Sequence, residues 1–393
     1  MWQGEFRKLW GVGIVTGSIR WLEVLAIGIY TFELSGSAFT VALMLFSRTL
    51  PGVAFGAIMG TLASRYRRRH LLVLGMILAT VNALVMLILA QTYLLSLGAI
   101  AIAAAINGCI WTLEHPVRKT LLGDVAKSGQ LRQAMSLDQL TVNGTRLVGP
   151  LVGGAVYATL GLIGIYAVSA SGFAIAAVLA LRTTANPPKV VTDKGESFST
   201  SLIQGLHYIR NRRVLRGILL FTIIVNFFGF SYMTMVPVIG RELLSLNPVS
   251  IGILQSMEGI GAVLASILLA RSSRAFRFAR SCTLGGLTFL TLLLFFALSP
   301  WFWLSCVALF VAGVGIGCFG TMQSTTILSH SDPLQRMRVM GVLVMCIGAA
   351  PIGVLTIGAL AEWAGPGVAL IIMVGGGLVA SVVCVFRYPE LLD

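Results

Sequence analysis

Residues 71–90 read LLVLGMILATVNALVMLILA and contain no charged side chain. As an α-helix, this stretch would extend about 30 Å, which matches the hydrocarbon core of a bilayer. Apolar runs of similar length recur before and after it along the whole chain. The sequence therefore predicts a membrane protein built from many spanning helices.

The apolar runs are divided by clusters of charged and turn-forming residues. They predict spans near 11–32, 38–63, 71–90, 94–115, 138–160 and 163–181, and then near 214–238, 249–270, 281–298, 302–325, 338–361 and 367–386. The longest polar stretch, 183–200, separates six spans from six. We expect an N-terminal bundle (1–182), a cytoplasmic linker with an interfacial helix (183–213) and a C-terminal bundle (214–393).

Composition and charge agree with a membrane protein and exclude a soluble one. The chain is 57% hydrophobic and 11% charged, whereas soluble domains are about 25% charged. Its net charge of +14 would favour a nucleic-acid partner in a soluble protein. With both termini in the cytoplasm, however, 24 of the 28 Lys and Arg residues fall in cytoplasmic loops. We therefore expect a bacterial inner-membrane protein that contacts lipid and binds no nucleic acid.

Motifs for catalysis, metals and cofactors are absent from the sequence. The six cysteines lie in apolar runs without CxxC spacing, and the four histidines have no metal-ligand spacing. Neither a phosphate-binding GxxxxGK[ST] loop nor a serine elbow occurs. We expect neither an enzyme nor a bound metal or cofactor.

Several charged residues fall deep within the predicted spans, where each costs at least about 2.5–3.5 kcal/mol. They are Arg20, Glu23, Arg48, Arg146 and Glu258. In one interpretation, Arg20 and Glu23 share a helical face and form a structural ion pair. In the other, these residues line a central cavity with Asn226, and Glu23 or Glu258 carries a proton; Glu258 is the better carrier because its own span has no basic residue. The excess of one positive charge favours an anionic or zwitterionic substrate.

Three segments carry further motifs. Residues 60–69 read GTLASRYRRR, residues 113–119 read LEHPVRK and residues 146–154 read RLVGPLVGG. In the last segment, Pro150 removes a backbone donor, while Gly149, Gly153, Gly154 and the preceding Gly144 allow a neighbouring backbone to approach closely. This face serves either tight packing or gating. Glu114 and Arg118 form either an inward-facing gate near Arg65 or a solvated pair at the surface.

These segments resemble the major facilitator superfamily, in its branch of drug:proton antiporter-like proteins that includes macrolide-efflux and enterobactin-exporter proteins. The first is similar to the signature Gly-x-x-Ala-Asp-Arg-x-Gly-Arg-Arg, with Gly60, Arg65 and Arg68 in place, but Ser64 replaces the acid and Arg67 the second glycine. The second resembles an Asp-x-Pro-x-Arg-Gln segment, and the third resembles the antiporter signature of span five.

The resemblance implies an all-α major facilitator fold, with twelve spans in two pseudo-symmetric six-helix bundles. It also implies a monomeric secondary transporter of a small organic solute, most simply a proton-coupled exporter of a drug, siderophore or metabolite. Uptake and flipping of a lipid-like substrate stay open, because a fold does not fix direction. A membrane sensor or assembly protein that no longer transports is the alternative of another class, motivated by Ser64.

Overall fold

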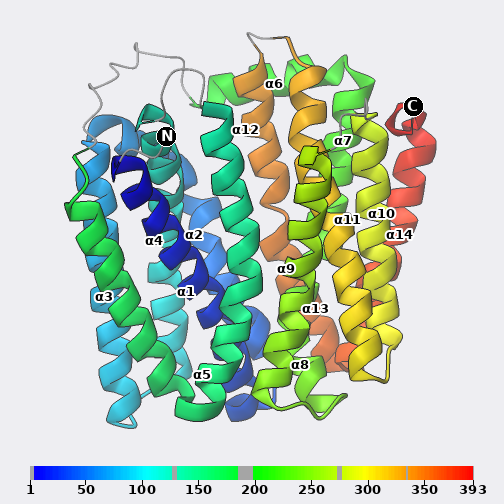
Figure 1. Ribbon diagram of the computed structural model, residues 1–393. Helices are drawn as coiled ribbons and strands as arrows, with labels where there is room; N and C mark the ends of the chain where they lie inside the picture. The colour runs from blue at the N-terminus through cyan, green and yellow to red at the C-terminus, as the bar shows by residue number, and fades with distance from the viewer. Residues whose placement is uncertain (1–3, 126–130, 185–197, 272–276, 333–334, 393) are drawn as a thin grey trace. The chain divides into compact units, whose positions relative to one another are not determined.

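The computed structural model of the protein describes residues 4–125, 131–184, 198–271, 277–332 and 335–392. Within these ranges the chain forms helices and short links, with no strand (Figure 1). The first half contains α1 (Gly4–Ser35), α2 (Ala38–Arg65), α3 (Arg68–Gln91), α4 (Leu97–Val125) and α5 (Leu131–Leu181), and α6 (Phe198–Arg210) follows.

The second half repeats this pattern with more interruptions. It contains α7 (Arg213–Ile224), the π-helix η1 (Val225–Gly229), α8 (Tyr232–Glu242), α9 (Pro248–Arg271), α10 (Phe278–Leu298), α11 (Phe302–Ser329), α12 (Arg336–Ile347), α13 (Ala350–Ala364), α14 (Pro366–Arg387) and the short η2 (Pro389–Leu391). Helices α7, η1 and α8 follow one another as one span, as do α12 and α13. Proline occupies the first turn of α13 and α14, where a missing N–H costs nothing.

The described part of the chain provides twelve helical segments that can cross a membrane. Eleven continuous segments in the described part of the chain are long and apolar enough to span a bilayer. One of them, Leu137–Leu181, is broken at Gly161, whose φ of 60° and ψ of −155° lie in a region open essentially only to glycine. The break turns one long helix into spans five and six. The prediction of an all-α protein with about twelve spans is confirmed.

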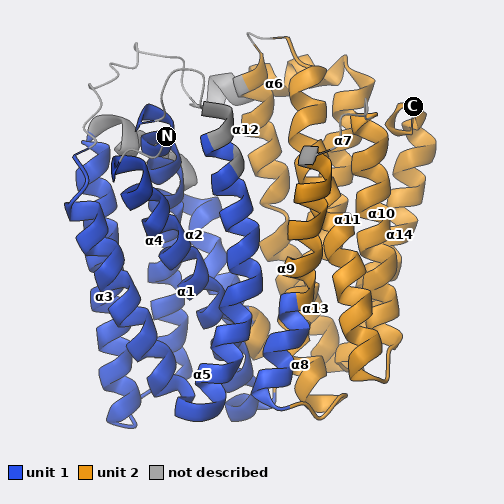
Figure 2. Cartoon of the chain, viewed as in Figure 1, with its two compact units in different colours: residues 1–36, 43–194, 247–256 blue, residues 37–42, 195–246, 257–393 orange. Residues whose placement is uncertain are grey.

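Internal contacts divide the chain into two compact units (Figure 2). Unit 1 comprises residues 1–36, 43–194 and 247–256, and unit 2 comprises 37–42, 195–246 and 257–393. Unit 1 buries several apolar clusters between its helices, one of them around Leu9, Leu72 and Leu121. In unit 2, the buried Phe289 ring contacts the rings of Phe230 and Tyr232.

Every second link between spans is very short. These links are residues 36–37, 92–96, Gly161, 243–247, 299–301 and Gly365. All of the positive-φ residues in the described chain lie in them: Gly36, Tyr93, Gly161, Ser245 and Gly365. Because consecutive spans run antiparallel, alternate links of each half emerge at the same end of that half.

Candidate functional site

A buried ion pair joins α1 and α2 within unit 1. The Arg48 guanidinium donates to Glu23 Oε2 at 3.0 Å, and the two side chains are 8% and 1% exposed. Glu23 Oε2 also accepts from the Asn107 amide at 3.1 Å, while Oε1 has no hydrogen-bond partner among the described residues. The network continues to α3, where Asn82 donates to Asn107 Oδ1 and to the Ala103 carbonyl, each at 3.1 Å.

Arg20 contacts aromatic rings instead of Glu23. Its guanidinium carbon lies 3.8 Å from the centroid of the Trp111 ring and 5.7 Å from that of Trp21. Trp111 also stacks on His115 at 5.1 Å, and the Arg146 guanidinium lies 5.2 Å from the Trp21 centroid. The predicted Arg20–Glu23 ion pair is therefore wrong. Three-residue spacing places both side chains on one face, but Arg48 on the neighbouring helix takes the carboxylate.

A second charged cluster lies closer to the end of α4. Arg118 donates to Glu114 Oε1 at 2.8 Å and to Asp138 Oδ1 of α5 at 2.6 Å. The three side chains are 4% exposed or less, and Lys119 Nζ lies 4.0 Å from Asp138 Oδ2. The expectation of a solvated surface pair is wrong, because α4 continues to Val125 and α5 covers this turn.

Gly13 of α1 makes the space for this cluster. A Cβ atom on Gly13 would collide with the Arg118 guanidinium. Arg118 of α4 thus pairs with Glu114 on its own helix and with Asp138 on α5, and its guanidinium packs against Gly13 of α1. One buried cation therefore contacts three helices of unit 1.

The segment after α2 forms a more exposed contact. Arg68 donates to Asp124 Oδ2 at 2.8 Å, and these side chains are 23% and 32% exposed. Gly60, Ser64 and Arg65 belong to α2, but their side chains lie outside the described part of the chain. Their predicted roles, including an Arg65 contact with Glu114 and Arg118, stay predictions.

The glycines of the RLVGPLVGG segment pack α5 against two helices. Added Cβ atoms on Gly149 and Gly153 would meet the backbone of α1, at Ser18 O (2.7 Å) and Leu22 Cα (3.1 Å) respectively. On Gly154, a Cβ would meet the start of α9 at Pro248 O (2.5 Å). Ser256 Oγ of α9 donates to the Leu147 carbonyl at 2.8 Å. All of these contacts lie within unit 1.

Gly144 does not share this role, so the prediction of a close backbone approach at Gly144 is wrong. A Cβ there would meet nothing within 4 Å. We expect Gly149→Ala to destabilise the protein by about 1–3 kcal/mol through overpacking, and Gly144→Ala to be neutral or slightly stabilising. Thermal unfolding of the two purified variants measures the difference. Equal melting temperatures for the two variants would contradict the assigned α1–α5 contact.

Glu258 lies in unit 2, near the middle of α9, and its side chain is 2% exposed. The backbone of α11 passes directly beside it, because a Cβ on Gly313 would collide with the Glu258 carbonyl. Asn226 lies in the π-helix η1 and donates to the Thr222 carbonyl at 2.9 Å. Gln323 of α11 donates to the Thr222 hydroxyl at 2.6 Å.

The same kind of close glycine–backbone contact occurs at a charged span in each half. In the second span, a Cβ on Gly108 of α4 would collide with the Arg48 carbonyl. In the eighth span, Gly313 of α11 meets the Glu258 carbonyl in the same way. Gly353 of α13 likewise meets Phe227 O, as Gly149 meets Ser18 O. In each half, therefore, a glycine lets a neighbouring helix pack closely against the backbone of the deep charged residue.

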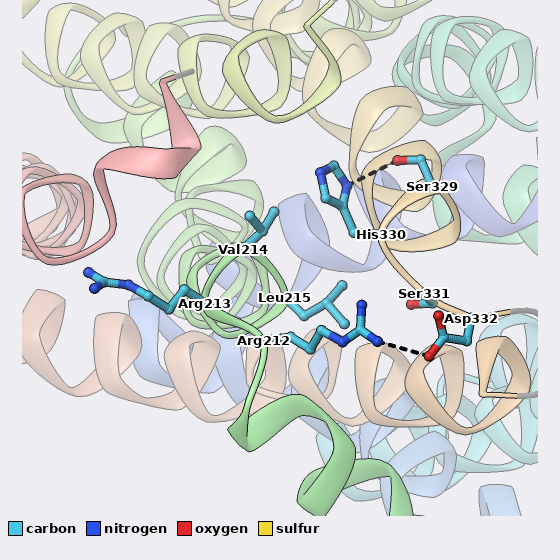
Figure 3. A pocket seen from close by; sticks show the side chains of 8 residues that line it. All are labelled: Arg212, Arg213, Val214, Leu215, Ser329, His330, Ser331 and Asp332. Carbon is cyan, nitrogen blue, oxygen red and sulfur yellow. Dashed lines mark hydrogen bonds and ion pairs between the residues drawn. The ribbon is translucent and has the colours of Figure 1, made fainter.

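A separate cavity of about 320 Å³ lies in unit 2, beside the start of α7 (Figure 3). Its lining residues are Arg212, Arg213, Val214, Leu215, Ser329, His330, Ser331 and Asp332. Arg212 donates to Asp332 at 2.9 Å and Arg213 pairs with Glu390 at 2.7 Å. Its two cations are thus already paired, and none of the predicted substrate residues lines it.

Residues 1–391 match the family described as transmembrane secretion effector within the major facilitator superfamily (MFS). The chain belongs to this family. It is a multi-pass membrane transporter of a small molecule, and its relatives and structural neighbours are transporters, not enzymes. The family resemblance stated from the motifs is confirmed.

Relatives of this transporter cover nearly its whole length. It is 24% identical to the uncharacterised MFS-type transporter YfiS of Bacillus subtilis (90% of this chain, 88% of the relative). It is 21% identical to the staphyloferrin A transporter of Staphylococcus aureus (85% and 84%) and 25% identical to the multidrug efflux pump Tap of Mycolicibacterium fortuitum (90% and 87%).

Solved structures agree on the fold of this transporter. A POT family transporter matches with a TM-score of 0.78 at 12% identity, over 99% of this chain and 96% of that one. A bacterial homologue of the lysosomal transporter Spinster, inward-facing and occupied, matches with 0.72 at 14% identity, over 100% and 97%. At such identities the likeness concerns the fold alone.

Proposed function

We propose that the protein exports a small organic solute from the bacterial cytoplasm by alternating access, in exchange for protons. The observation that supports this most directly is the buried Glu258 near the middle of a membrane helix, since a deep acid without a task would be costly. Relatives named as a multidrug efflux pump, a macrolide efflux protein and a staphyloferrin A transporter support a small-molecule cargo.

The proposal includes an arrangement in the membrane. The protein is a monomer of the inner membrane with both termini in the cytoplasm, as the distribution of Lys and Arg favours. Residues 1–182 and 214–393 form the two bundles, and 183–213 form the cytoplasmic linker.

Glu258 is the proposed proton carrier, and Glu23 is a structural partner. The Glu23 carboxylate is held by Arg48 and Asn107, so protonation would break a buried ion pair. Glu258 lies in a span whose described residues contain no other charge until its end at Arg271.

Two features of unit 1 support the gating half of the mechanism. The Arg118 cluster ties α4 and α5 to the Gly13 notch in α1, and the glycines of α5 hold that helix against α1 and the start of α9. Both are discrete contacts, formed in this structure between named side chains and backbone atoms. In the proposal, they open and close as access alternates between the two sides.

Comparing small molecules in cells and spent medium, with and without this protein, tests the direction of transport. Deletion is expected to raise the exported compound inside the cell and lower it in the medium. A compound depleted inside and enriched in the medium would instead establish uptake. Identical profiles across several growth media would contradict transport as the role of this protein.

A further inference from the structure

Arg20 carries a charge near the middle of α1 that forms no direct ion pair with a described acid. Its recorded contacts are the faces of Trp111, at 3.8 Å, and Trp21, at 5.7 Å. Among the described residues, it makes neither a hydrogen bond nor an ion pair within 4 Å. Of the neighbouring deep cations, Arg48 is paired with Glu23, and Arg146 lies against the Trp21 ring. The Arg20 guanidinium therefore has room for an ion-pair partner that the described residues do not supply.

Stacking leaves the hydrogen-bonding edge of this guanidinium available. A cation–π contact uses the flat face of the group, whereas its five N–H donors point outward in its plane. Two of these donors fit the two oxygens of a carboxylate in a fork. The close stack on Trp111 also restricts rotation of the group, so less entropy is lost when an anion binds.

The location requires water or a ligand beside Arg20. The side chain is partly accessible although it lies midway along a membrane helix. A charge at such depth avoids lipid and faces a partner or a water-filled space. Trp111, at the centre of α4, is 38% exposed and lies against the same guanidinium. An aromatic and cationic surface of unit 1 is thus open at mid-depth.

We propose that Arg20 binds the carboxylate of an organic monoanion, stacked on Trp111 while its edge donors hold the two oxygens. This inference rests on the proposed transport function and specifies the class of its substrate. A carboxylate supplies the ion-pair partner that Arg20 lacks among the described residues, since Glu23 is already paired with Arg48. The Arg146 guanidinium lies 5.2 Å from the Trp21 ring and adds positive electrostatic potential near this site.

Binding of benzoate and benzamide tests this assignment, because the two are similar in shape and differ in charge. Equilibrium dialysis against the full-length protein in nanodiscs, with empty nanodiscs subtracted, gives both affinities. We expect benzoate to bind at least ten-fold more tightly than benzamide. Arg20→Gln is expected to remove this preference, and Arg20→Lys to retain only part of it, since a lysine keeps the charge but not the fork. Arg280→Gln, which removes an exposed cation on α10, is the matched control and should bind as wild type.

The outcomes separate this inference from the proposed function. Equal affinity for benzoate and benzamide, or an Arg20→Gln variant that keeps the preference, would overturn the carboxylate site. A melting temperature for Arg20→Gln near that of wild type shows that its fold is intact; if it is unfolded, Trp111→Leu, which removes the stacking ring, replaces it in the same assay. Dialysis needs no gradient, so a failure of export leaves the binding result intact, and the reverse also holds.

Discussion

Replacing Arg118 by methionine is expected to destabilise the protein by about 3–5 kcal/mol. Arg118 lies between Glu114 and Asp138, and all three side chains are almost completely buried. Removing this cation leaves Glu114 without its partner and Asp138 with only Lys119 at 4.0 Å, and both acids are buried. Thermal unfolding of the purified variant should show a large fall in melting temperature.

Two comparisons identify the cause of that loss. The triple variant Arg118→Met/Glu114→Gln/Asp138→Asn removes the stranded charges as well, and it should recover most of the stability. Arg68→Met breaks the partly exposed pair with Asp124 and should cost less than about 1 kcal/mol. A triple variant as unstable as Arg118→Met would show that packing of the arginine, and not its charge, holds the three helices together.

Glu258→Gln is expected to abolish proton-driven export while substrate exchange without a gradient continues. Glutamine keeps the size of the side chain but cannot release a proton, so only steps that need protonation should fail. Proteoliposomes loaded with the exported compound measure both activities, with and without an imposed pH gradient. If the Glu258→Gln variant still exports the compound against its gradient at the wild-type rate, Glu258 is not the proton carrier.

Two acidic residues serve as controls for this experiment. Glu242→Gln changes an exposed acid at the end of α8 and should behave as wild type. Glu23→Gln weakens the partner of Arg48 and should lower the melting temperature. The variants of the two buried acids should therefore differ: Glu258→Gln should lose proton-coupled export, and Glu23→Gln should lose thermal stability.

Most of the fold follows from the sequence, because a span must supply about 20 apolar residues wherever it lies. Even the turn between spans five and six is predicted within a few residues of Gly161. Helix interruptions are harder to predict. The π-helix around Asn226 and the separation of α12 from α13 leave the hydropathy unchanged, since both lie within apolar runs.

The candidate site is less accessible to sequence reasoning, because charges pair across helices. The spacing of Arg20 and Glu23 predicts a shared face but not that Arg48 arrives from α2. One signal was present in α4, where polar or aromatic residues recur every three or four positions at Asn107, Trp111, Glu114 and Arg118. Such a stripe marks one face of a helix. Its partner Asp138 stands at the first residue of the predicted span 138–160, where nothing in the sequence indicates that it is buried.

The short alternate links have a consequence for how the protein meets its surroundings. Gly161 and Gly365 each connect two spans alone, and no link at that end is longer than the five residues of 92–96 or 243–247. With the proposed orientation, this end faces outward. Proteases cleave preferentially at protruding loop tips, and antibodies bind there; the links at this end are too short to protrude far. Epitope tags for topology mapping therefore belong in the five-residue links, since an insertion at Gly161 would unfold the turn that joins two spans.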